Sequence, residues 1–207
     1  MEGRWNMARL LLVRHGEVES NDVRRYWGHR DVPLSAVGRD QAERLRGRLM
    51  GEGLAAVYSS DLSRARETAE IIAQPHRAPM VQCSELREID FGRFEGMTFD
   101  EVKTAFPGAE KHFGGDATWR FPGGESLADL SARVGRFAER LEVLGADQPV
   151  LVVGHGGSLR VLTCLLLGLE VTRWWQLRVD RASLSIVETF AEGGVLSLLN
   201  DVSHLRR

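Results

Sequence analysis

Two histidines stand in short glycine-containing segments, and each segment directly follows an apolar run. Arg14–Gly16 (RHG) follows Leu10–Val13, and Gly154–Gly157 (GHGG) follows Val150–Val153. A neutral imidazole can attack phosphorus, the planar fork of an adjacent arginine fits phosphate oxygens, and Gly16 allows close backbone approach. These residue types indicate phosphoryl chemistry, although the RHG tripeptide alone is equally compatible with a histidine and an arginine exposed in a loop.

A third segment adds candidate cations at the start of a predicted helix, Ser60–Ala73. The N-terminus of a helix favours an anion through its free amide groups and its dipole. Arg64 and Arg66 lie two residues apart, so they point to roughly opposite faces of the helix. Only one of them can reach a shared site, and the spacing alone does not choose between them.

Carboxylates supply the candidate acid of the reaction. The segment Leu86–Gly96 places several acidic residues, Glu88 among them, between apolar residues and glycines. A glutamate that is partly shielded from water beside a phosphate could donate a proton to a leaving group. A solvated acidic loop is the ordinary alternative for such a run.

The glycine-rich turn around His155 does not match the common nucleotide or serine-hydrolase motifs. The dinucleotide pattern GxGxxG fails because Leu159 stands where the third glycine belongs, and no GxxxxGK[ST] segment occurs. A GxSxG elbow is also absent, since Leu159 and Arg160 follow Ser158. What remains is a histidine at a helix N-terminus with free backbone amides, which is suited to an anion.

Strands and helices alternate around these segments, which predicts an α/β fold with a mostly parallel central sheet and helices on both faces. The predicted strands are Leu10–Val13, Ala55–Tyr58, Val150–Val153, Ser183–Thr189 and Val195–Leu199, the last two forming a hairpin. The predicted helices are Ser35–Met50, Ser60–Ala73, one from a Thr98–Glu101 capping box, Ser126–Leu144 and Ser158–Leu167.

Ligands of such sheets bind beyond the carboxyl ends of the strands, so we expect His15 and His155 to meet at one edge. The irregular stretch Pro107–Gly124 is long for a compact domain and predicts a functional insertion. We therefore expect a single domain over residues 1–207 with a small lid at about residues 98–125.

Composition limits the function classes. The 207 residues carry a net charge of -2, which argues against a general nucleic-acid binder or a polybasic membrane binder. Cys83 and Cys164 form no metal or disulfide pattern, no apolar run could span a membrane, and residues 1–9 do not resemble a signal peptide. We expect a cytoplasmic protein without nucleic-acid or membrane partners, in which Met1 or Met7 could be the start.

Taken together, the motifs resemble those of the histidine phosphatase superfamily, the phosphoglycerate-mutase-like group, over Leu10 to about Leu205. They occur in the family's order: Arg14–Gly16, Ser60–Ala69 (SDLSRARETA), Leu86–Gly96, Pro122–Ser126 (PGGES) and Gly154–Arg160 (GHGGSLR).

The resemblance implies a role for individual residues. His15 matches the nucleophile that becomes phosphorylated, Glu88 the proton donor, and His155 the second histidine of the pocket, which we expect to be charged. The implied phosphate ligands are Arg14, Asn21, Arg64 and the amide of Gly156, which chooses Arg64 over Arg66. Ser20 stands where the family usually has a tryptophan. The resemblance implies neither a cofactor nor a metal.

The implied activity is hydrolysis of a small phosphomonoester. The segment Tyr26–Leu34 and the loop around Glu88 resemble the α-ribazole phosphatase and broad-specificity branch, and Trp27, Phe113, Trp119 and Phe121 are candidates for an apolar wall. A cofactor-dependent phosphoglycerate mutase is the alternative, although GHGGS differs from the HGNS of typical mutases and the lid is short. A non-catalytic phospho-ligand-binding relative is a further alternative. Trp174, Trp175 and the strand ending near Leu199 are candidates for a homodimer interface.

Overall fold

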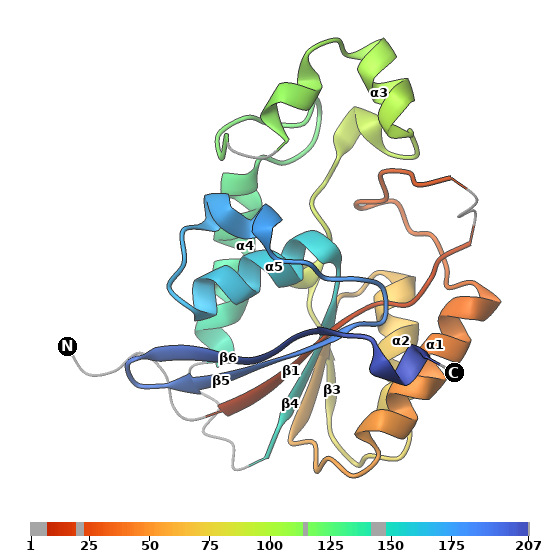
Figure 1. Ribbon diagram of the computed structural model, residues 1–207, viewed down its shortest axis with the longest axis vertical. Helices are drawn as coiled ribbons and strands as arrows, with labels where there is room; N and C mark the ends of the chain where they lie inside the picture. The colour runs from red at the N-terminus through yellow and green to blue at the C-terminus, as the bar shows by residue number, and fades with distance from the viewer. Residues whose placement is uncertain (1–7, 20–22, 114–115, 142–147, 207) are drawn as a thin grey trace.

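The computed structural model describes residues 8–19, 23–113, 116–141 and 148–206, and a six-stranded sheet forms its centre (Figure 1). The strand order is β3-β2-β4-β1-β5-β6. The strands are β1 (Ala8–Arg14), β2 (Ala56–Ser59), β3 (Met80–Gln82), β4 (Val150–Gly154), β5 (Leu184–Phe190) and β6 (Gly193–Asp201). The four strands from β3 to β1 are parallel, and β5 and β6 add an antiparallel edge, so the mostly parallel sheet is confirmed.

Helices cover both faces of the sheet, as expected. The helices are α1 (Ala36–Leu49), α2 (Ser63–Ala73), α3 (Phe99–Ala105), α4 (Leu127–Leu141) and α5 (Gly156–Leu166). Alternate residues of β1 show the two layers: Leu11 and Val13 pack in a cluster with α1 and α2, whereas Leu10 and Leu12 pack with α4 and α5. Because β1 is buried on both faces, its apolar run is continuous rather than alternating.

The sheet changes winding direction between β1 and β4. The chain leaves β1 toward α1 on one face and leaves β4 toward α5 on the opposite face. In a doubly wound sheet, such a reversal opens a crevice at the carboxyl ends of the two strands. His15 and His155 are the first residues after β1 and β4, so the topology brings them to this crevice.

Several boundaries differ from the predicted ones. The edge strand β3 was missed because it is short and partly exposed and its residues do not alternate. The helix predicted from Ser60 begins at Ser63, and the helix predicted from Ser158 begins at Gly156. The Thr98–Glu101 capping box is present at the start of α3. The end of the predicted Ser126–Leu144 helix lies outside the described residues. Met1 and Met7, the two candidates for the first residue of the protein, also lie outside them.

The predicted lid is described at residues 98–113 and 116–125, and these residues extend away from the sheet (Figure 1). It contains α3, a 3-10 turn at Ala109–His112, and a segment that returns to α4. None of the described helices is long and apolar enough to span a membrane. Cys83 and Cys164 are buried and form no disulfide.

Candidate active site

A cavity of about 450 Å³ opens at the crevice between β1 and β4. His15 and Glu88 line it, together with the backbone of Gly156 and Gly157. Its other charged lining residues are all arginines: Arg14, Arg24, Arg25, Arg160 and Arg181. The apolar lining is Val18, Tyr26, Trp27, Ile89, Phe91, Phe99, Phe113, Phe121 and Trp174. The cavity is therefore lined partly by cationic side chains and partly by aromatic side chains, which together are called the aromatic wall.

His15 is held as a neutral imidazole with one nitrogen available. The side chain is 5% exposed, and its Nδ1 lies 2.7 Å from the carbonyl oxygen of Gly16, to which it donates a hydrogen bond. Burial, followed by the charges of Arg64 and Arg14, lowers the pKa of His15 well below its usual value. Since Nδ1 carries the proton, Nε2 keeps the lone pair that a nucleophile needs.

Gly16 allows a close backbone approach, as expected, and the backbone that it approaches is that of Gly38. A side chain at this position would place its Cβ 2.5 Å from the carbonyl oxygen of Gly38 in the first turn of α1. The glycine therefore lets the loop after β1 pack backbone to backbone on α1. The amide of Gly16 donates to Thr68 Oγ1 at 3.3 Å, which ties the loop to α2 as well.

His155 lies beside His15, with 5.0 Å between the ring centroids. Arg64 Nε donates to His155 Nδ1 at 3.3 Å, so the opposite nitrogen, Nε2, carries the proton and donates to Ser60 Oγ at 2.9 Å. Burial lowers the pKa of His155 well below its usual value, and the charge of Arg64 lowers it further. The expectation of a charged His155 is therefore corrected: in this arrangement it is a neutral donor and acceptor.

The structure places Arg64, not Arg66, at the site. Arg64 is 1% exposed, and besides His155 it donates to the carbonyl oxygens of Gly28 at 2.6 Å and Arg30 at 2.9 Å. Arg66 lies on the surface beside Glu70. Because Arg64 is committed to these acceptors and does not line the cavity, its predicted contact with phosphate stays a prediction.

Arg14 presents donors to the cavity. Its Nη1 donates to the carbonyl oxygen of Val179 at 2.8 Å, while its buried Nε has no hydrogen-bond partner among the residues that the structure describes. Burial lowers the pKa of Arg14 to about 10. A Cβ on Gly156 would lie 3.3 Å from the Arg14 guanidinium carbon, so the first amide of α5 and this guanidinium border the same space. Asn21, the remaining predicted phosphate ligand, lies outside the described residues.

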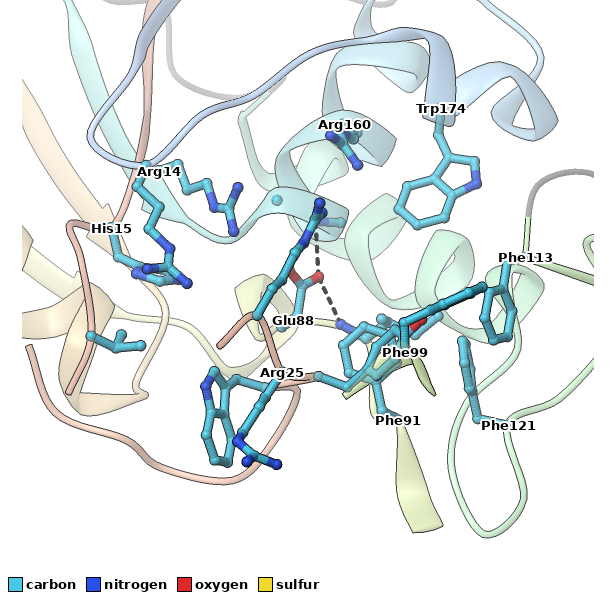
Figure 2. Close-up of a pocket in the computed structure, with 18 residues that line it drawn as sticks. Arg14, His15, Arg25, Glu88, Phe91, Phe99, Phe113, Phe121, Arg160 and Trp174 are labelled. Atoms are coloured by element: carbon cyan, nitrogen blue, oxygen red, sulfur yellow. Dashed lines mark hydrogen bonds between the residues drawn. The ribbon is translucent and has the colours of Figure 1, made fainter. Parts of the chain in front are cut away.

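Glu88 is fixed by backbone amides at the start of α5. The amide of Gly157 donates to both carboxylate oxygens, at 2.9 and 3.0 Å, and the amide of Ile89 donates to Oε1 at 3.0 Å. The carboxyl group lines the cavity between Arg14 and Phe99 in the view of Figure 2. The structure therefore brings His15, Glu88 and the amide end of α5 together.

A partly buried ion pair braces the loop that carries Glu88. Arg133 on α4 binds Glu125 through Nε and Nη2, at 2.9 and 2.7 Å. The same guanidinium donates to the carbonyl oxygens of Glu85, Arg87 and Glu88. Glu125 in turn accepts from the amide of Asp90 at 3.0 Å. The glutamate of the PGGES motif thus has a positioning contact that sequence reasoning left unassigned.

The aromatic wall is only partly the predicted one. Trp27, Phe113 and Phe121 line the cavity, whereas Trp119 packs behind them, with its ring centroid 4.8 Å from that of Phe121. Trp174 also lines the cavity, and Trp175 is exposed. The homodimer interface for which both were candidates stays a prediction.

Sequence reasoning also missed Arg160 and Ser60. Arg160 had a usable signal, since it follows Gly156 by one helical turn and must share its face. Ser60 stands in the matched SDLSRARETA motif but was given no role.

Comparison with known proteins decides the family. The model of the histidine phosphatase superfamily (branch 1) matches residues 10–202. The chain belongs to this superfamily. It is 36% identical over 200 residues to "Phosphoserine phosphatase 1" of Hydrogenobacter thermophilus, covering 96% of this chain and 95% of that protein. It is 37% identical over 206 residues to "Probable phosphoglycerate mutase GpmB" of Salmonella newport, with the same coverage.

Solved structures of this superfamily share the whole fold. The α-ribazole phosphatase from Shigella flexneri superposes with a TM-score of 0.85 at 31% identity, over 93% of this chain and 96% of that one. A mycobacterial glucosyl-3-phosphoglycerate phosphatase with inorganic phosphate gives a TM-score of 0.84 at 30% identity, over 96% and 100%. Relatives with these names act on different substrates, so membership of the superfamily fixes the chemistry more closely than the substrate.

Proposed function

We propose that this histidine phosphatase superfamily member is a metal-independent phosphomonoester hydrolase that works through a phosphohistidine on His15. The observation that carries the proposal is the state of His15: a buried, neutral imidazole whose Nδ1 donates to the Gly16 carbonyl, with Glu88 on the same cavity. This arrangement supplies a nucleophile and a proton donor on either side of one space.

In the first step, Nε2 of His15 attacks the phosphorus in line with the ester oxygen. The N–P bond forms as the P–O ester bond breaks, and the leaving alkoxide takes the proton of the Glu88 carboxyl group. The products of this step are the free alcohol, the Glu88 carboxylate and phosphorylated His15.

In the second step, a water molecule gives a proton to the Glu88 carboxylate while its oxygen attacks the phosphorus. The N–P bond breaks, inorganic phosphate leaves, and His15 and Glu88 return to their starting forms. One residue thus acts as acid and then as base, as microscopic reversibility requires.

Positive charge for the transferred group comes from this chain's own donors. Arg14 and Gly156, which carries the first amide of α5, line the cavity beside His15, and the charge of the buried Arg64 acts on the same histidine. Preorganised donors of this kind stabilise charge spread over the phosphoryl oxygens. Within the described ranges, no group of three His, Cys, Asp or Glu side chains could hold a metal ion.

Two finer assignments belong to this proposal. α-Ribazole 5'-phosphate is the specific substrate that the sequence suggested, and the aromatic wall would suit its base. Phosphoglycerate mutase activity is the alternative outcome, in which the phosphohistidine returns its group to a second hydroxyl instead of water. Both substrates enter the test below.

The proposal is tested by hydrolysis of p-nitrophenyl phosphate in EDTA, together with 3-phosphoglycerate and α-ribazole 5'-phosphate. We expect turnover that resists EDTA and a phosphoryl adduct on His15, detected by mass spectrometry after quenching without acid. His15→Ala should lose both. Turnover that needs an added metal, or an adduct on another residue, would overturn the mechanism; isomerisation of phosphoglycerate faster than its hydrolysis would favour the mutase.

A further inference from the structure

Arg160 points into the cavity without a polar partner. It lies on α5, its guanidinium carbon is 5.8 Å from the centre of the Trp174 ring, and its Nε is buried without a hydrogen bond. Among the described residues, no hydrogen bond or ion pair of this side chain is found. Burial lowers its pKa. An enclosed cation without a partner is costly, and the cost is recovered when a ligand supplies an anion.

Two of the other arginines of the cavity form ion pairs. Arg25 pairs with Glu101 at 3.1 Å, and Arg181 pairs with Glu17. Arg14, Arg24 and Arg160 line the cavity and form no ion pair with an acidic side chain among the described residues. Glu88 is the acidic side chain that lines this cavity. In the first step of the proposed mechanism the Glu88 carboxyl group carries its proton, so a dianionic phosphoryl group would balance two of these three cations. One positive charge is then left for a further monoanion.

The position of Arg160 separates it from the phosphoryl group. In Figure 2, Arg14 and His15 lie on one side of Glu88, whereas Arg160 and Trp174 lie toward the other. Arg160 therefore faces the part of the cavity that the alcohol portion of a substrate would occupy.

We propose that Arg160 binds a carboxylate on the alcohol portion of the substrate, so that the preferred substrates are phosphomonoesters that also carry a carboxylate. The inference rests on the proposed phosphatase function and narrows its substrate class. It favours carboxylate-bearing esters over α-ribazole 5'-phosphate, which carries no carboxylate. The planar guanidinium of Arg160 can donate two parallel hydrogen bonds to a carboxylate. The same guanidinium lies over the Trp174 ring. The aromatic wall remains available for an apolar carbon skeleton between the two anions.

The test uses two matched pairs of substrates, one short and one long. Each pair holds a carboxylate and its carboxamide: 3-phosphonooxypropanoate with its amide, and 4-carboxyphenyl phosphate with 4-carbamoylphenyl phosphate. A charge-assisted pair that an amide cannot replace is worth about tenfold or more in kcat/KM. We expect that preference for the carboxylate in at least one pair. In Arg160→Gln the ratio should fall to about one, and Arg160→Lys should restore part of it.

Arg136 on α4 supplies the matched control, because it is exposed and donates to the carbonyl oxygen of Ala132 within its own helix. Arg136→Gln should keep the wild-type ratio. A wild-type ratio below threefold in both pairs, an undiminished ratio in Arg160→Gln, or faster turnover of α-ribazole 5'-phosphate than of either carboxylate would overturn the inference. Failure to hydrolyse any ester would instead overturn the proposed function.

Discussion

Replacing Gly157 by alanine tests whether the exact position of Glu88 matters. The new Cβ would lie 2.2 Å from Glu88 Oε1 and 3.5 Å from the Trp174 ring, while ordinary contact begins at 3.4 Å. The atom in the way is the end of a flexible side chain, so the carboxyl group can move aside by about 1 Å. In moving, it gives up its paired hydrogen bonds from the Gly157 amide.

The two consequences differ in size. A reacting group that is displaced by about 1 Å costs on the order of 10²-fold in rate. For stability, the loss of one or two hydrogen bonds, each worth about 1 kcal/mol, is offset by the gain of about 1 kcal/mol when alanine replaces glycine in a helix. We therefore expect Gly157→Ala to be nearly as stable as the wild type and about 100-fold slower.

The assay compares an alkyl phosphate with p-nitrophenyl phosphate. An alkoxide needs a proton as it leaves, whereas p-nitrophenolate is a much better leaving group, so the loss of rate should be larger for the alkyl ester. Gly135→Ala on α4 is the matched control, because a Cβ there meets no other atom within 4 Å. If Gly157→Ala hydrolyses the alkyl ester at the wild-type rate, the position assigned to Glu88 is wrong.

Three further predictions follow from the buried polar groups. Because burial depresses the pKa of His15 and of His155, the unfolded chain binds protons that the native protein does not. Stability should therefore fall as pH drops below about 6.5, by up to about 1.4 kcal/mol per pH unit for each histidine. Urea titrations at pH 7 and 5 measure this, and an unchanged slope in His155→Asn would contradict it. Glu125→Gln should lower the free energy of unfolding in urea by about 2 kcal/mol, because it leaves Arg133 without its carboxylate. The value of kcat should also fall, because the loop that carries Glu88 shifts. Unchanged stability and kcat in this variant would contradict the role given to the Arg133–Glu125 ion pair. Ser60→Ala removes the acceptor of the His155 Nε2–H group and should lower the free energy of unfolding by about 1 kcal/mol. It should also lower kcat/KM, and Ser60→Thr should restore part of that loss. Equal losses in both variants would argue against a hydrogen bond that orients His155.

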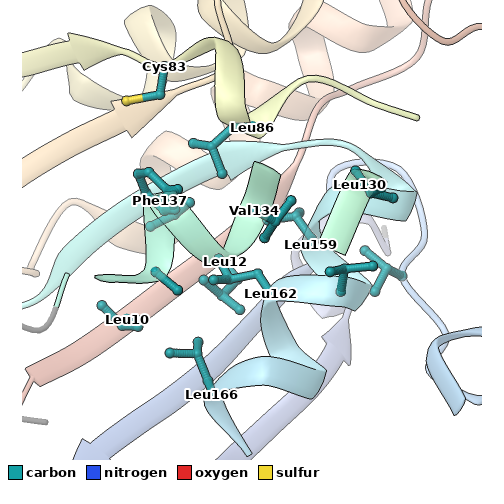
Figure 3. Packing of buried hydrophobic residues seen from close by; sticks show 14 of the residues in the cluster. Leu10, Leu12, Cys83, Leu86, Leu130, Val134, Phe137, Leu159, Leu162 and Leu166 are labelled. Atoms are coloured by element: carbon teal, nitrogen blue, oxygen red, sulfur yellow. The ribbon is translucent and has the colours of Figure 1, made fainter. Parts of the chain in front are cut away.

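The layers of the fold could be predicted because the core residues carry the pattern of their element. On α4, Leu130, Val134 and Phe137 recur at helical spacing. All three belong to the buried cluster that also contains residues of α5 together with Leu10 and Leu12 of β1 (Figure 3). The order of the strands does not follow from such patterns, since it depends on pairings between distant segments. The strand β3 lacked a pattern because its three residues are half-buried or exposed.

The candidate site was partly predictable for the same reason. His15 and Glu88 stand in motifs with local signals, and the parallel sheet places them at one edge. The charge of His155 and the contact that requires Gly16 could not be foreseen, because both depend on neighbours from other elements, Arg64 and Gly38. A sequence motif identifies such residues but does not show which atoms of other elements contact them.

The central place of β1 ties activity to completion of the whole chain. Leu10 pairs with Val150 on one side of β1, and Ala8 pairs with Thr189 on the other. During synthesis, the first strand must therefore wait for partners made near the end, and closing such long loops slows folding. The proposed nucleophile, His15 at the end of β1, cannot be brought into this site by an N-terminal fragment. Recovery of phosphatase activity after dilution from denaturant would then report the last, most distant contacts rather than early local helices.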